Sequence, residues 1–198
     1  VYIAIFVGML FVSAIRLRLV RIIATVGVLL MPLAWFVLKD YQKQRILVFM
    51  NPDIDPFGSG YHIIQSKIAI GSGTIFGKGL FNGTQSQLNF LPENHTDFIF
   101  SVIGEELGFI GCIFVLILLF MLIYRSIKVA YSCNDRFGML LATGIGSMLC
   151  FEVLVNAGMT MGIMPVTGIP LPFISYGVSA LTTNMISVGI LLNISMQR

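Results

Sequence analysis

Five apolar runs of roughly membrane-spanning length divide this sequence, and they constrain its fold more than any other feature. They lie at about residues 1–15, 20–38, 98–124, 137–163 and 178–197, with charged or turn-forming residues between them. A helix needs about 20 consecutive apolar residues to cross the hydrocarbon core of a bilayer. Charged residues make up only 11% of the chain, far below the roughly 25% of a soluble domain. The sequence therefore predicts an all-α, polytopic integral membrane protein with five transmembrane helices, forming a single membrane domain over residues 1–198.

The basic residues predict how these helices are oriented. They gather in the first connection, in the third connection and at the end of the chain: Arg16, Arg18, Arg21, Arg125, Lys128, Arg136 and Arg198. With five helices, all three places fall on one side, and an excess of Lys and Arg marks the cytoplasmic side. We therefore expect a cytoplasmic C-terminus, with residues 39–97 and 164–177 facing outward. The net charge of +3 is too small to predict binding to nucleic acid.

The stretch 39–97 is too long to be a simple connection, because loops beyond about 15 residues are usually functional or disordered. Its "YHIIQSKIAI" segment suits a helix lying in the membrane interface, with Lys67 reaching toward the headgroups. The following "GSGTIFGKGLFNGTQSQLNFLPE" is rich in glycine and amide side chains. We expect it to fold against the membrane and to present backbone N–H groups to an anion. The stretch 39–97 is thus predicted to be a large extracytoplasmic loop with interfacial helices.

A nucleotide-binding loop is excluded in this segment, since Lys78 is followed by Gly79 where a Walker A motif needs Ser or Thr. Lys67 and Lys78 remain candidates for binding the diphosphate of a lipid, and the alternative is that both are solvated surface lysines. Further along, residues 164–177 contain Pro165, Pro170 and Pro172. Proline interrupts helices, so this second outward stretch is predicted to be a bent loop that lines a cavity on the outer side.

Asp97, in "PENHTDFIF" immediately before the third apolar run, is the principal candidate for chemistry. One interpretation is structural, because Asp or Thr directly before an apolar helix is a preferred N-cap. The other is that a carboxylate at the outer membrane boundary, beside Glu93 and His95, takes a proton from a substrate held at headgroup level. The two interpretations are compatible, because a residue at a helix start is held rigidly.

Three further acidic residues lie inside apolar runs, where ionisable groups are costly and often functional. Glu105 and Glu106 lie about 12–14 Å deeper than Asp97 along a helix that rises roughly 1.5 Å per residue. They are candidates for function or for hydrogen bonds that fix the packing of the bundle. Glu152 has Asn156 one turn later on the same helix face, and we interpret this pair as a structural polar contact.

Several stretches resemble one family, the SEDS proteins of bacterial shape, elongation, division and sporulation. The segments that carry the resemblance are "NPDIDPFGSGYHIIQSKIAIGSG", "GKGLFNGTQSQLNFLPENHTDFIFSVIGEELGFIG" and "GIPLPFISYG". The first two are closer to the elongation members than to the division members. Val178 and Thr74 stand where the family commonly has glycine, and each adds a β-branched side chain at a flexible position. Family members have ten spanning helices, so the resemblance implies that this chain corresponds to their C-terminal half and carries half of the groove that should hold lipid substrates.

The resemblance also implies a function, namely polymerisation of lipid II into glycan strands in the bacterial plasma membrane during elongation and rod-shape maintenance. Lipid II, the growing polyprenyl-linked glycan, membrane lipid and a class B penicillin-binding protein would be the partners. Asp97 falls on the aspartate of the family's H-T-D-F motif, which is required for polymerisation. A divalent cation, Mg²⁺ or Mn²⁺, is the cofactor considered for offsetting the charge of the diphosphate. Two other functions stay open: a lipid II flippase and a noncatalytic scaffold for a cell-wall synthase.

Other residues receive roles from this mechanism. Glu93, His95 and Thr96 would shape the site around Asp97, and Gln85 and Gln87 would recognise sugar or peptide amides. The substrate-binding residues predicted from the sequence are Lys67, Lys78, Gln85, Gln87, Glu93, His95, Thr96, Pro170 and Ser175. The supporting residues predicted from it are Glu105, Glu106, Glu152 and Asn156.

Overall fold

The computed structural model describes residues 1–13, 17–51, 54–55, 58–88, 90–91 and 93–197, and all regular elements among them are helices. Arg16 and Arg198, used above to predict the orientation, lie outside the described residues, as does the side chain of Arg18. The helices are α1 (Tyr2–Val12), α2 (Leu17–Val37), α3 (Asp40–Met50), α4 (Ser59–Ser72), α5 (Thr84–Gln87), α6 (Ile99–Ser132), α7 (Arg136–Thr160) and α8 (Val178–Met196).

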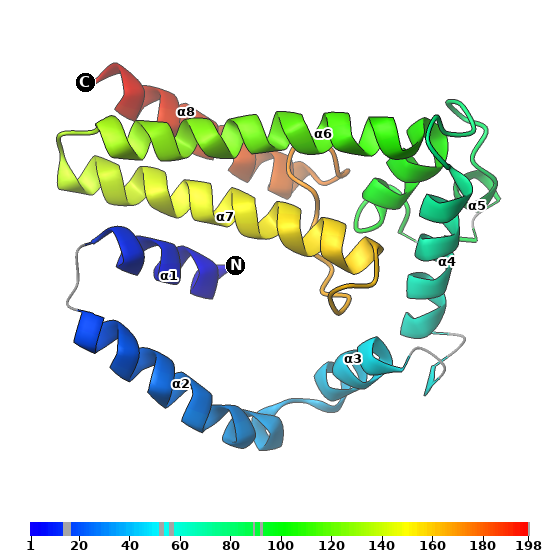
Figure 1. Ribbon diagram of the computed structural model, residues 1–198, viewed down its shortest axis with the longest axis horizontal. Helices are drawn as coiled ribbons and strands as arrows, with labels where there is room; N and C mark the ends of the chain where they lie inside the picture. Colours follow the sequence, from blue (N-terminus) through cyan, green and yellow to red (C-terminus); the bar gives the residue numbers. More distant parts are fainter. Residues whose placement is uncertain (14–16, 52–53, 56–57, 89, 92, 198) are drawn as a thin grey trace.

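Three long helices, α6, α7 and α8, lie side by side and form the main bundle (Figure 1). Among the described residues, these three are long and apolar enough to cross a membrane. Helix α1 packs against α7 but has only 11 residues. Helix α2 coincides with the second apolar run and lies apart from the bundle, together with α3 (Figure 1). The chain is therefore all-helical with membrane-spanning helices, while the arrangement of five spans stays a prediction.

Small residues on α7 allow its neighbours to approach closely. A side chain at Gly146 would overlap the Ser126 hydroxyl on α6, and one at Gly144 would overlap Met9 on α1. Small residues are typical of helix interfaces in membranes, where close van der Waals packing replaces the hydrophobic driving force. The glycines of α7 thus fix which helix faces meet.

Helix α4 is fastened across one end of this bundle by buried hydroxyl groups. The hydroxyls of Ser66 on α4 and Ser101 on α6 lie 2.6 Å apart. Ser66 also donates to the backbone oxygen of Thr160 on α7, at 2.6 Å. All three residues are completely buried, so these hydrogen bonds join α4, α6 and α7 where water does not compete. They place α4 over the first turn of α6 and the last turn of α7 (Figure 1).

Helix α6 is broken at Gly108, which has φ 67° and ψ −164°. The break frees backbone groups, and the glycine-rich segment 74–79 pairs with them. Lys78 N–H and Gly79 N–H donate to the oxygens of Glu105 and Glu106 at 3.0 Å, while Phe109 N–H donates to Thr74 O at 3.0 Å. Irregular backbone at membrane depth is tolerated where protein satisfies it. A side chain at Gly108 would overlap segment 74–79, so the pairing requires glycine.

This pairing corrects the expectation that the glycine-rich segment presents its backbone N–H groups to an external anion. Gly77 N–H donates to Gly73 O at 2.8 Å, and the next two N–H groups serve the broken helix. The physical reason is that a broken helix buried in protein needs partners for its own backbone groups, and the nearest irregular segment supplies them.

Candidate functional site

The candidate site lies where the segment before α6 meets the loop between α7 and α8, here called the 161–177 loop. Both gather at the end of the bundle that α4 and α5 cover (Figure 1). Asp97 belongs to the first segment and is partly buried. Residues 93–97 and the proline-rich loop, which both carry predicted substrate-binding residues, are joined by hydrogen bonds.

Asp97 is not the N-cap of α6, which corrects one of the two interpretations drawn from the sequence. The cap position is Phe98, and no side chain caps the helix. Phe98 is only 3% exposed, and its N–H donates to Glu93 O at 3.3 Å. Burial of this ring and the turn from Glu93 thus set the helix start one residue later than predicted. Among the described residues, none donates a hydrogen bond to the Asp97 carboxylate, so that group is available to a substrate.

The surroundings of Asp97 favour its protonated form more than water does. Partial burial raises the pKa of this carboxyl above its ordinary value of 3.8, and the nearby Glu93 carboxylate raises it further. Arg45 acts in the opposite direction. A carboxylate whose pKa moves toward neutrality becomes a better proton acceptor, because general bases work best when their pKa lies near the operating pH.

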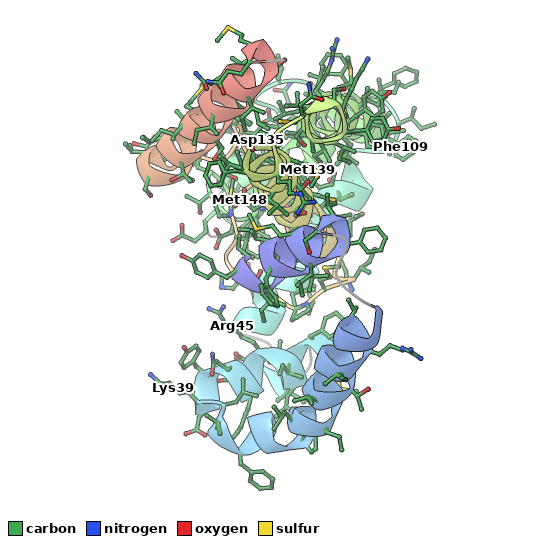
Figure 2. All side chains as sticks on the ribbon, turned by 90° about the vertical axis from the view of Figure 1, so that its left-hand side faces the viewer. Lys39, Arg45, Phe109, Asp135, Met139 and Met148 are labelled. Atoms are coloured by element: carbon green, nitrogen blue, oxygen red, sulfur yellow. The ribbon has the colours of Figure 1, made fainter. Side chains whose placement is uncertain are left out.

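Arg45 is a site residue that the sequence reasoning missed. It lies on α3, and its Nη1 donates to the Val166 backbone oxygen in the 161–177 loop at 3.3 Å. Figure 2 shows Arg45 reaching from α3 toward the bundle. In the sequence it is one of several basic residues in a long outward stretch, and no local signal separates it from Lys39 or Lys43. The structure thus places a guanidinium, not either predicted lysine, in electrostatic contact with Asp97.

Three consecutive carbonyl groups ending at Asp97 are each held by a residue from outside their own segment. Tyr176 N–H donates to His95 O at 2.8 Å. The Ser175 hydroxyl donates to Thr96 O at 2.7 Å, and Asn156 Nδ2 on α7 donates to Asp97 O at 2.9 Å. The backbone of the candidate catalytic segment is therefore attached to α7 and to the 161–177 loop.

The bonds of Asn156 also correct the predicted contact between Glu152 and Asn156. Asn156 Nδ2 gives its second hydrogen bond to Ile169 O at 2.8 Å, so its two donors serve two loop carbonyls. The described residues include no hydrogen bond between these side chains. Glu152 is half-buried on α7. The amide bonds to these carbonyls because buried backbone oxygens need a hydrogen-bond donor.

Gly168 brings the 161–177 loop against the carboxylate itself. A Cβ on this glycine would lie 3.2 Å from Asp97 Oδ2, and its φ of 71° lies in the region that favours glycine. The carboxylate is therefore bounded on one side by bare backbone, which leaves little room for it to turn.

Glu105 forms a second polar cluster, deeper along α6. Its carboxylate is completely buried and accepts from Lys78 Nζ at 2.8 Å, Gln85 N–H at 3.0 Å and Ser86 N–H at 3.1 Å. The hydroxyl of Thr84 completes the set at 3.2 Å. The backbone N–H groups in the first turn of α5 thus bind the Glu105 carboxylate, which belongs to the protein itself. Lys78 is engaged by this carboxylate and by Thr84 Oγ1.

The other residues predicted from the sequence are distributed around these two clusters. Lys67 is exposed, and its side chain lies against the backbone of Gly162. Gln87 is exposed, Pro170 and Glu106 are half-buried, and the backbone oxygen of Glu106 accepts from Gly79 N–H. Gln85 has a buried side-chain oxygen with no partner among the described residues. Glu93 Oε2 accepts from the Thr96 hydroxyl at 3.0 Å, which joins two of the predicted site residues.

His62 on α4 is a further titratable group that the sequence reasoning missed. Its ring centroid lies 6.0 Å from that of Phe98, the residue after Asp97. Burial lowers the pKa of His62 below 6.5, while Asp55 and Glu93 oppose that effect. Only its position one residue after Tyr61 in an interfacial segment was visible in the sequence, and that gave no signal of a contact with residues 93–98.

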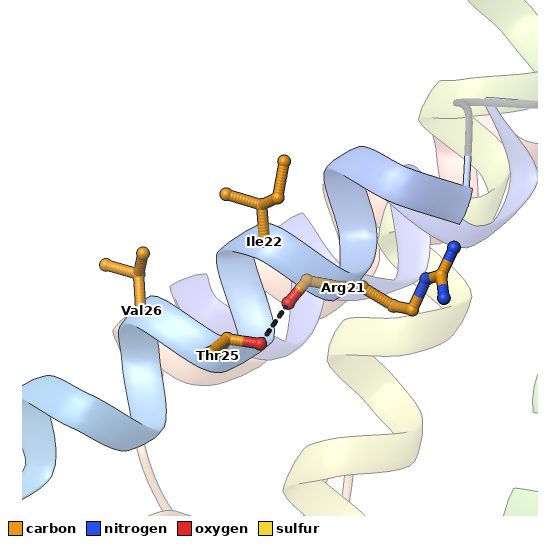
Figure 3. Close-up of a pocket in the computed structure, with 4 residues that line it drawn as sticks. All are labelled: Arg21, Ile22, Thr25 and Val26. Atoms are coloured by element: carbon orange, nitrogen blue, oxygen red, sulfur yellow. Dashed lines mark hydrogen bonds between the residues drawn. The ribbon is translucent and has the colours of Figure 1, made fainter.

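Two hollows in the surface differ in what they offer a ligand. One, of about 500 Å³, lies along α2 and is lined by Arg21, Ile22, Thr25 and Val26 (Figure 3). Its polar contact is a bond within the helix, from Thr25 Oγ1 to Arg21 O at 2.8 Å. The other is an apolar hollow of about 380 Å³, lined by residues of α6, α8 and the 161–177 loop: Val115, Leu118, Leu119, Leu122, Phe173, Ile174 and Val188. This second hollow shares its loop with the Asp97 site.

The described residues do not form a ready-made site for a divalent cation. They include no group of three or more His, Cys, Asp or Glu side chains placed to hold a metal ion. Of the two carboxylates near each other, Glu93 already accepts a hydrogen bond from Thr96. These residues therefore do not hold a divalent cation without further ligands from elsewhere.

The fold and the site define a helical membrane protein with a carboxylate at the end of its bundle that accepts no hydrogen bond from the described residues. Sequence comparison gives its family. The sequence profile of the FtsW/RodA/SpoVE family of cell cycle proteins matches residues 1–198. The chain belongs to this family, which confirms the resemblance seen in its motifs.

Two curated relatives show the degree of similarity. The chain is 48% identical over 190 residues to the peptidoglycan glycosyltransferase MrdB of Escherichia coli K12, covering 96% of this chain and 51% of that protein. It is 49% identical over 159 residues to the peptidoglycan glycosyltransferase RodA of Treponema pallidum, covering 80% of this chain and 37% of that protein. The chain thus spans about half the length, or less, of these relatives.

Two solved structures share the fold. One belongs to a peptidoglycan synthase complex that coordinates polymerization and crosslinking; it matches with a TM-score of 0.76 and 33% identity, over 96% of this chain and 52% of that one. The other is a mutant of the Thermus thermophilus rod shape determining protein RodA, with a TM-score of 0.53 and 37% identity, over 63% of this chain and 39% of that one.

Proposed function

We propose that this chain carries the catalytic carboxylate of a peptidoglycan glycosyltransferase that polymerises lipid II during cell elongation. The observation that carries the proposal is Asp97, a carboxylate that does not cap its helix, has a raised pKa and has its backbone fixed by two other parts of the protein. Family membership supports the proposal, because the relatives above are named peptidoglycan glycosyltransferases.

In this proposal Asp97 is the general base of a glycosyl transfer. The 4-hydroxyl oxygen of an acceptor lipid II attacks the anomeric carbon of the growing strand, and the bond from that carbon to the polyprenyl diphosphate breaks. The hydroxyl proton passes to Asp97, while the bonding electron pair leaves with the diphosphate. A base is needed because a sugar hydroxyl is a weak nucleophile until its proton is removed.

Arg45 is proposed to bind the diphosphate. It lies close enough to influence Asp97, it is exposed, and a guanidinium matches phosphate oxygens with paired donors. Lys78 is already bound by Glu105, which makes it a weaker candidate than the sequence suggested. Lys67 is exposed and stays a candidate for the headgroup region, as do Gln85 and Gln87 for amides of the substrate.

The lipid part of the substrate is proposed to occupy the apolar hollow beside the 161–177 loop. Phe173 and Ile174 line this hollow, and the next residue along the chain, Ser175, bonds to Thr96 O. A polyprenyl chain there would leave its headgroup near Asp97. In the membrane, we propose that residues 39–97 and 164–177 face outward and that the C-terminus is cytoplasmic, with five spans in this chain.

Partner and cofactor are separate proposals. A class B penicillin-binding protein is proposed as the partner, supported by the fold shared with a peptidoglycan synthase complex. Mg²⁺ or Mn²⁺ is proposed to bind chiefly through the substrate's diphosphate, since Mg²⁺ is commonly held by one or two carboxylates and substrate phosphates. Chelation should then slow polymerisation, and added metal should restore it.

The test uses the complete natural protein that contains this sequence, purified with its partner and supplied with labelled lipid II. The parent should make long glycan strands. Asp97→Asn should lower the rate by about a hundred- to ten-thousand-fold, the usual range for removing an acid–base group, with melting temperature and partner binding preserved. Asn keeps the size of the side chain but cannot accept the proton. A parental rate in Asp97→Asn would refute the catalytic role.

The two alternatives give other results in the same preparation. A flippase would move lipid II across liposome membranes without making polymer, and the acidic residues within the apolar helices, Glu105, Glu106 and Glu152, are the features that favour this function. Because Glu105 is already bound by four donors, it is poorly placed to serve a transport path. A scaffold would neither move nor polymerise lipid II but would raise the activity of its partner.

A further inference from the structure

We infer that Asn156 and Ser175 are positioning residues that hold the Asp97 carboxylate in its reactive place. This inference rests on the proposed function, since it concerns the same base. It differs from the roles predicted from the sequence, which made Ser175 a substrate-binding residue and Asn156 the partner of Glu152.

The backbone of residues 95–97 is held by hydrogen bonds from distant parts of the chain. Each of the three carbonyls accepts a bond from a residue at least 59 positions away in the sequence: Tyr176 N–H, the Ser175 hydroxyl and Asn156 Nδ2. The segment precedes α6, and no side chain caps that helix. The position of Asp97 is therefore set by these three attachments together with the turn from Glu93.

The side chains of Asn156 and Ser175 both join residues 95–97 to the 161–177 loop. Asn156 donates to Asp97 O and also to Ile169 O, at 2.9 and 2.8 Å. Ser175 donates to Thr96 O and accepts from Leu171 N–H, both at 2.7 Å. Asn156 is completely buried and Ser175 is 8% exposed, so water does not compete with these bonds. They hold the loop and the segment at a fixed separation.

The 161–177 loop, held by these bonds, also bounds the Asp97 carboxylate. Gly168, adjacent to Ile169, lies against Asp97 Oδ2, and Val166 accepts from Arg45. A shift of the loop would therefore change the wall beside the base, while Arg45 itself stays anchored on α3. General-base catalysis needs heavy atoms within hydrogen-bond reach, and a misplacement of about 1 Å can lower the rate roughly a hundredfold.

The experiment compares Ser175→Ala, Ser175→Thr and Asn156→Asp in the complete natural protein, with labelled lipid II as substrate. Ser175→Ala should lower kcat by about ten- to a hundredfold and change KM by less than about threefold, because a displaced base weakens the reaction and not substrate binding. Thr keeps the hydroxyl and should recover most of kcat. Asn156→Asp keeps the size, removes both amide donors and should lower kcat by about a hundredfold.

Ser126→Ala is the matched control. Ser126 is also buried, at 1% exposed, and its hydroxyl donates to Ile123 O within α6, so its loss should leave kcat within about threefold of the parent. Melting temperature in detergent shows that each variant is folded, and Ser175→Ala alone decides the question if Asn156→Asp does not fold.

The outcomes separate this inference from the proposed function. A parent that fails to polymerise, or an active Asp97→Asn, overturns the function and the inference with it. An active parent and an inactive Asp97→Asn, with Ser175→Ala at the parental kcat, overturn the inference alone. A raised KM with unchanged kcat in Ser175→Ala also overturns it, because that result assigns Ser175 to substrate binding. A loss of kcat that Thr restores supports it.

Discussion

Replacing Glu105 with Gln tests whether this buried carboxylate holds the glycine-rich segment and α5 against α6. Gln has the same shape, but one of its two terminal atoms is a donor. In the parent, the Ser86 N–H donates to Glu105 Oε2 at 3.1 Å. If the Gln amide keeps its oxygen toward Lys78 and Gln85, its nitrogen faces this N–H. If it flips, its nitrogen faces Lys78 and Gln85. Either orientation sets donor against donor.

The size of the effect follows from these contacts. The better orientation is the one that keeps the oxygen toward Lys78 and Gln85. It leaves the buried Ser86 N–H without an acceptor, which costs about 1–3 kcal/mol. It also makes the acceptor of the Lys78 bond neutral, which removes about half of the strength of that bond. Breaking a buried ion pair costs about 3–5 kcal/mol, and the Lys78 side chain is 26% exposed, so water partly solvates its ammonium group. We therefore expect about 3 kcal/mol, near the lower end of that range.

The assay is thermal unfolding of the complete protein in detergent. A change of 1 kcal/mol moves the melting temperature by about 2–4 °C in a domain of 150–250 residues and by about half as much in a protein twice as long. The melting temperature of the complete Glu105→Gln protein should therefore fall by about 3–6 °C. Glu106→Gln is the matched control, because Glu106 is the next residue on α6 and its side chain accepts no hydrogen bond from the described residues. It should melt within about 1 °C of the parent.

Two results would refute this reasoning. Equal melting of Glu105→Gln and Glu106→Gln would show that the cluster around Glu105 does not stabilise the fold. Parental melting together with complete loss of polymerisation would place Glu105 in the chemistry. A double-mutant cycle with Lys78→Met and Glu105→Leu adds a second measurement. If the two side chains are coupled, the double variant should lose less free energy of unfolding than the sum of the losses in the two single variants.

Three further predictions follow from the backbone and from pKa directions. Gly108→Ala should lower the free energy of unfolding by at least about 1–3 kcal/mol, since its backbone conformation is nearly exclusive to glycine, whereas Gly189→Ala, with open space around it, should not destabilise α8. The acid limb of the polymerisation rate should lie above pH 3.8, because burial and Glu93 raise the pKa of Asp97, and Glu93→Gln should move that limb to lower pH. The folded-state pKa of His62 is lowered by burial, so stability should fall as pH drops below about 6.5, where the unfolded chain binds the proton first; melting curves of His62→Phe should show a smaller fall.

The long helices could be predicted from the sequence because apolar runs report membrane-spanning segments directly. The third, fourth and fifth runs match α6, α7 and α8 closely at their first residues. The break at Gly108 could not be predicted in the same way. Its signal was a glycine inside an apolar run, which is compatible with an intact helix as well as with a break. What decides between them is the segment 74–79, about 30 residues away, that pairs with the freed backbone.

The site was predicted in part for a similar reason. Asp97 stands in a local motif, so it could be recognised from neighbouring letters. Arg45 and Asn156 act on it from α3 and α7, at sequence separations of more than 50 residues, and a single sequence contains no signal for such contacts. The predicted Glu152–Asn156 pair fits the helix period, but a tertiary contact displaced it, because Asn156 meets two loop carbonyls.

Asp97 and Glu105 show why a residue type in a motif does not by itself assign chemistry. Both are carboxylates at the same end of one helix segment, eight positions apart. Four donors surround the Glu105 carboxylate, which commits it to an anionic structural role. Around Asp97 the donors of the described residues go to backbone oxygens, so the segment is fixed while none of these residues bonds to its carboxylate. A base benefits from both conditions at once, because each hydrogen bond that holds a carboxylate by its own oxygens occupies a lone pair and lowers the affinity of that group for a proton. Placing Asp97 through its main chain satisfies both, and this is why the residues that bond to carbonyls 95–97 matter as much as the carboxylate they leave free.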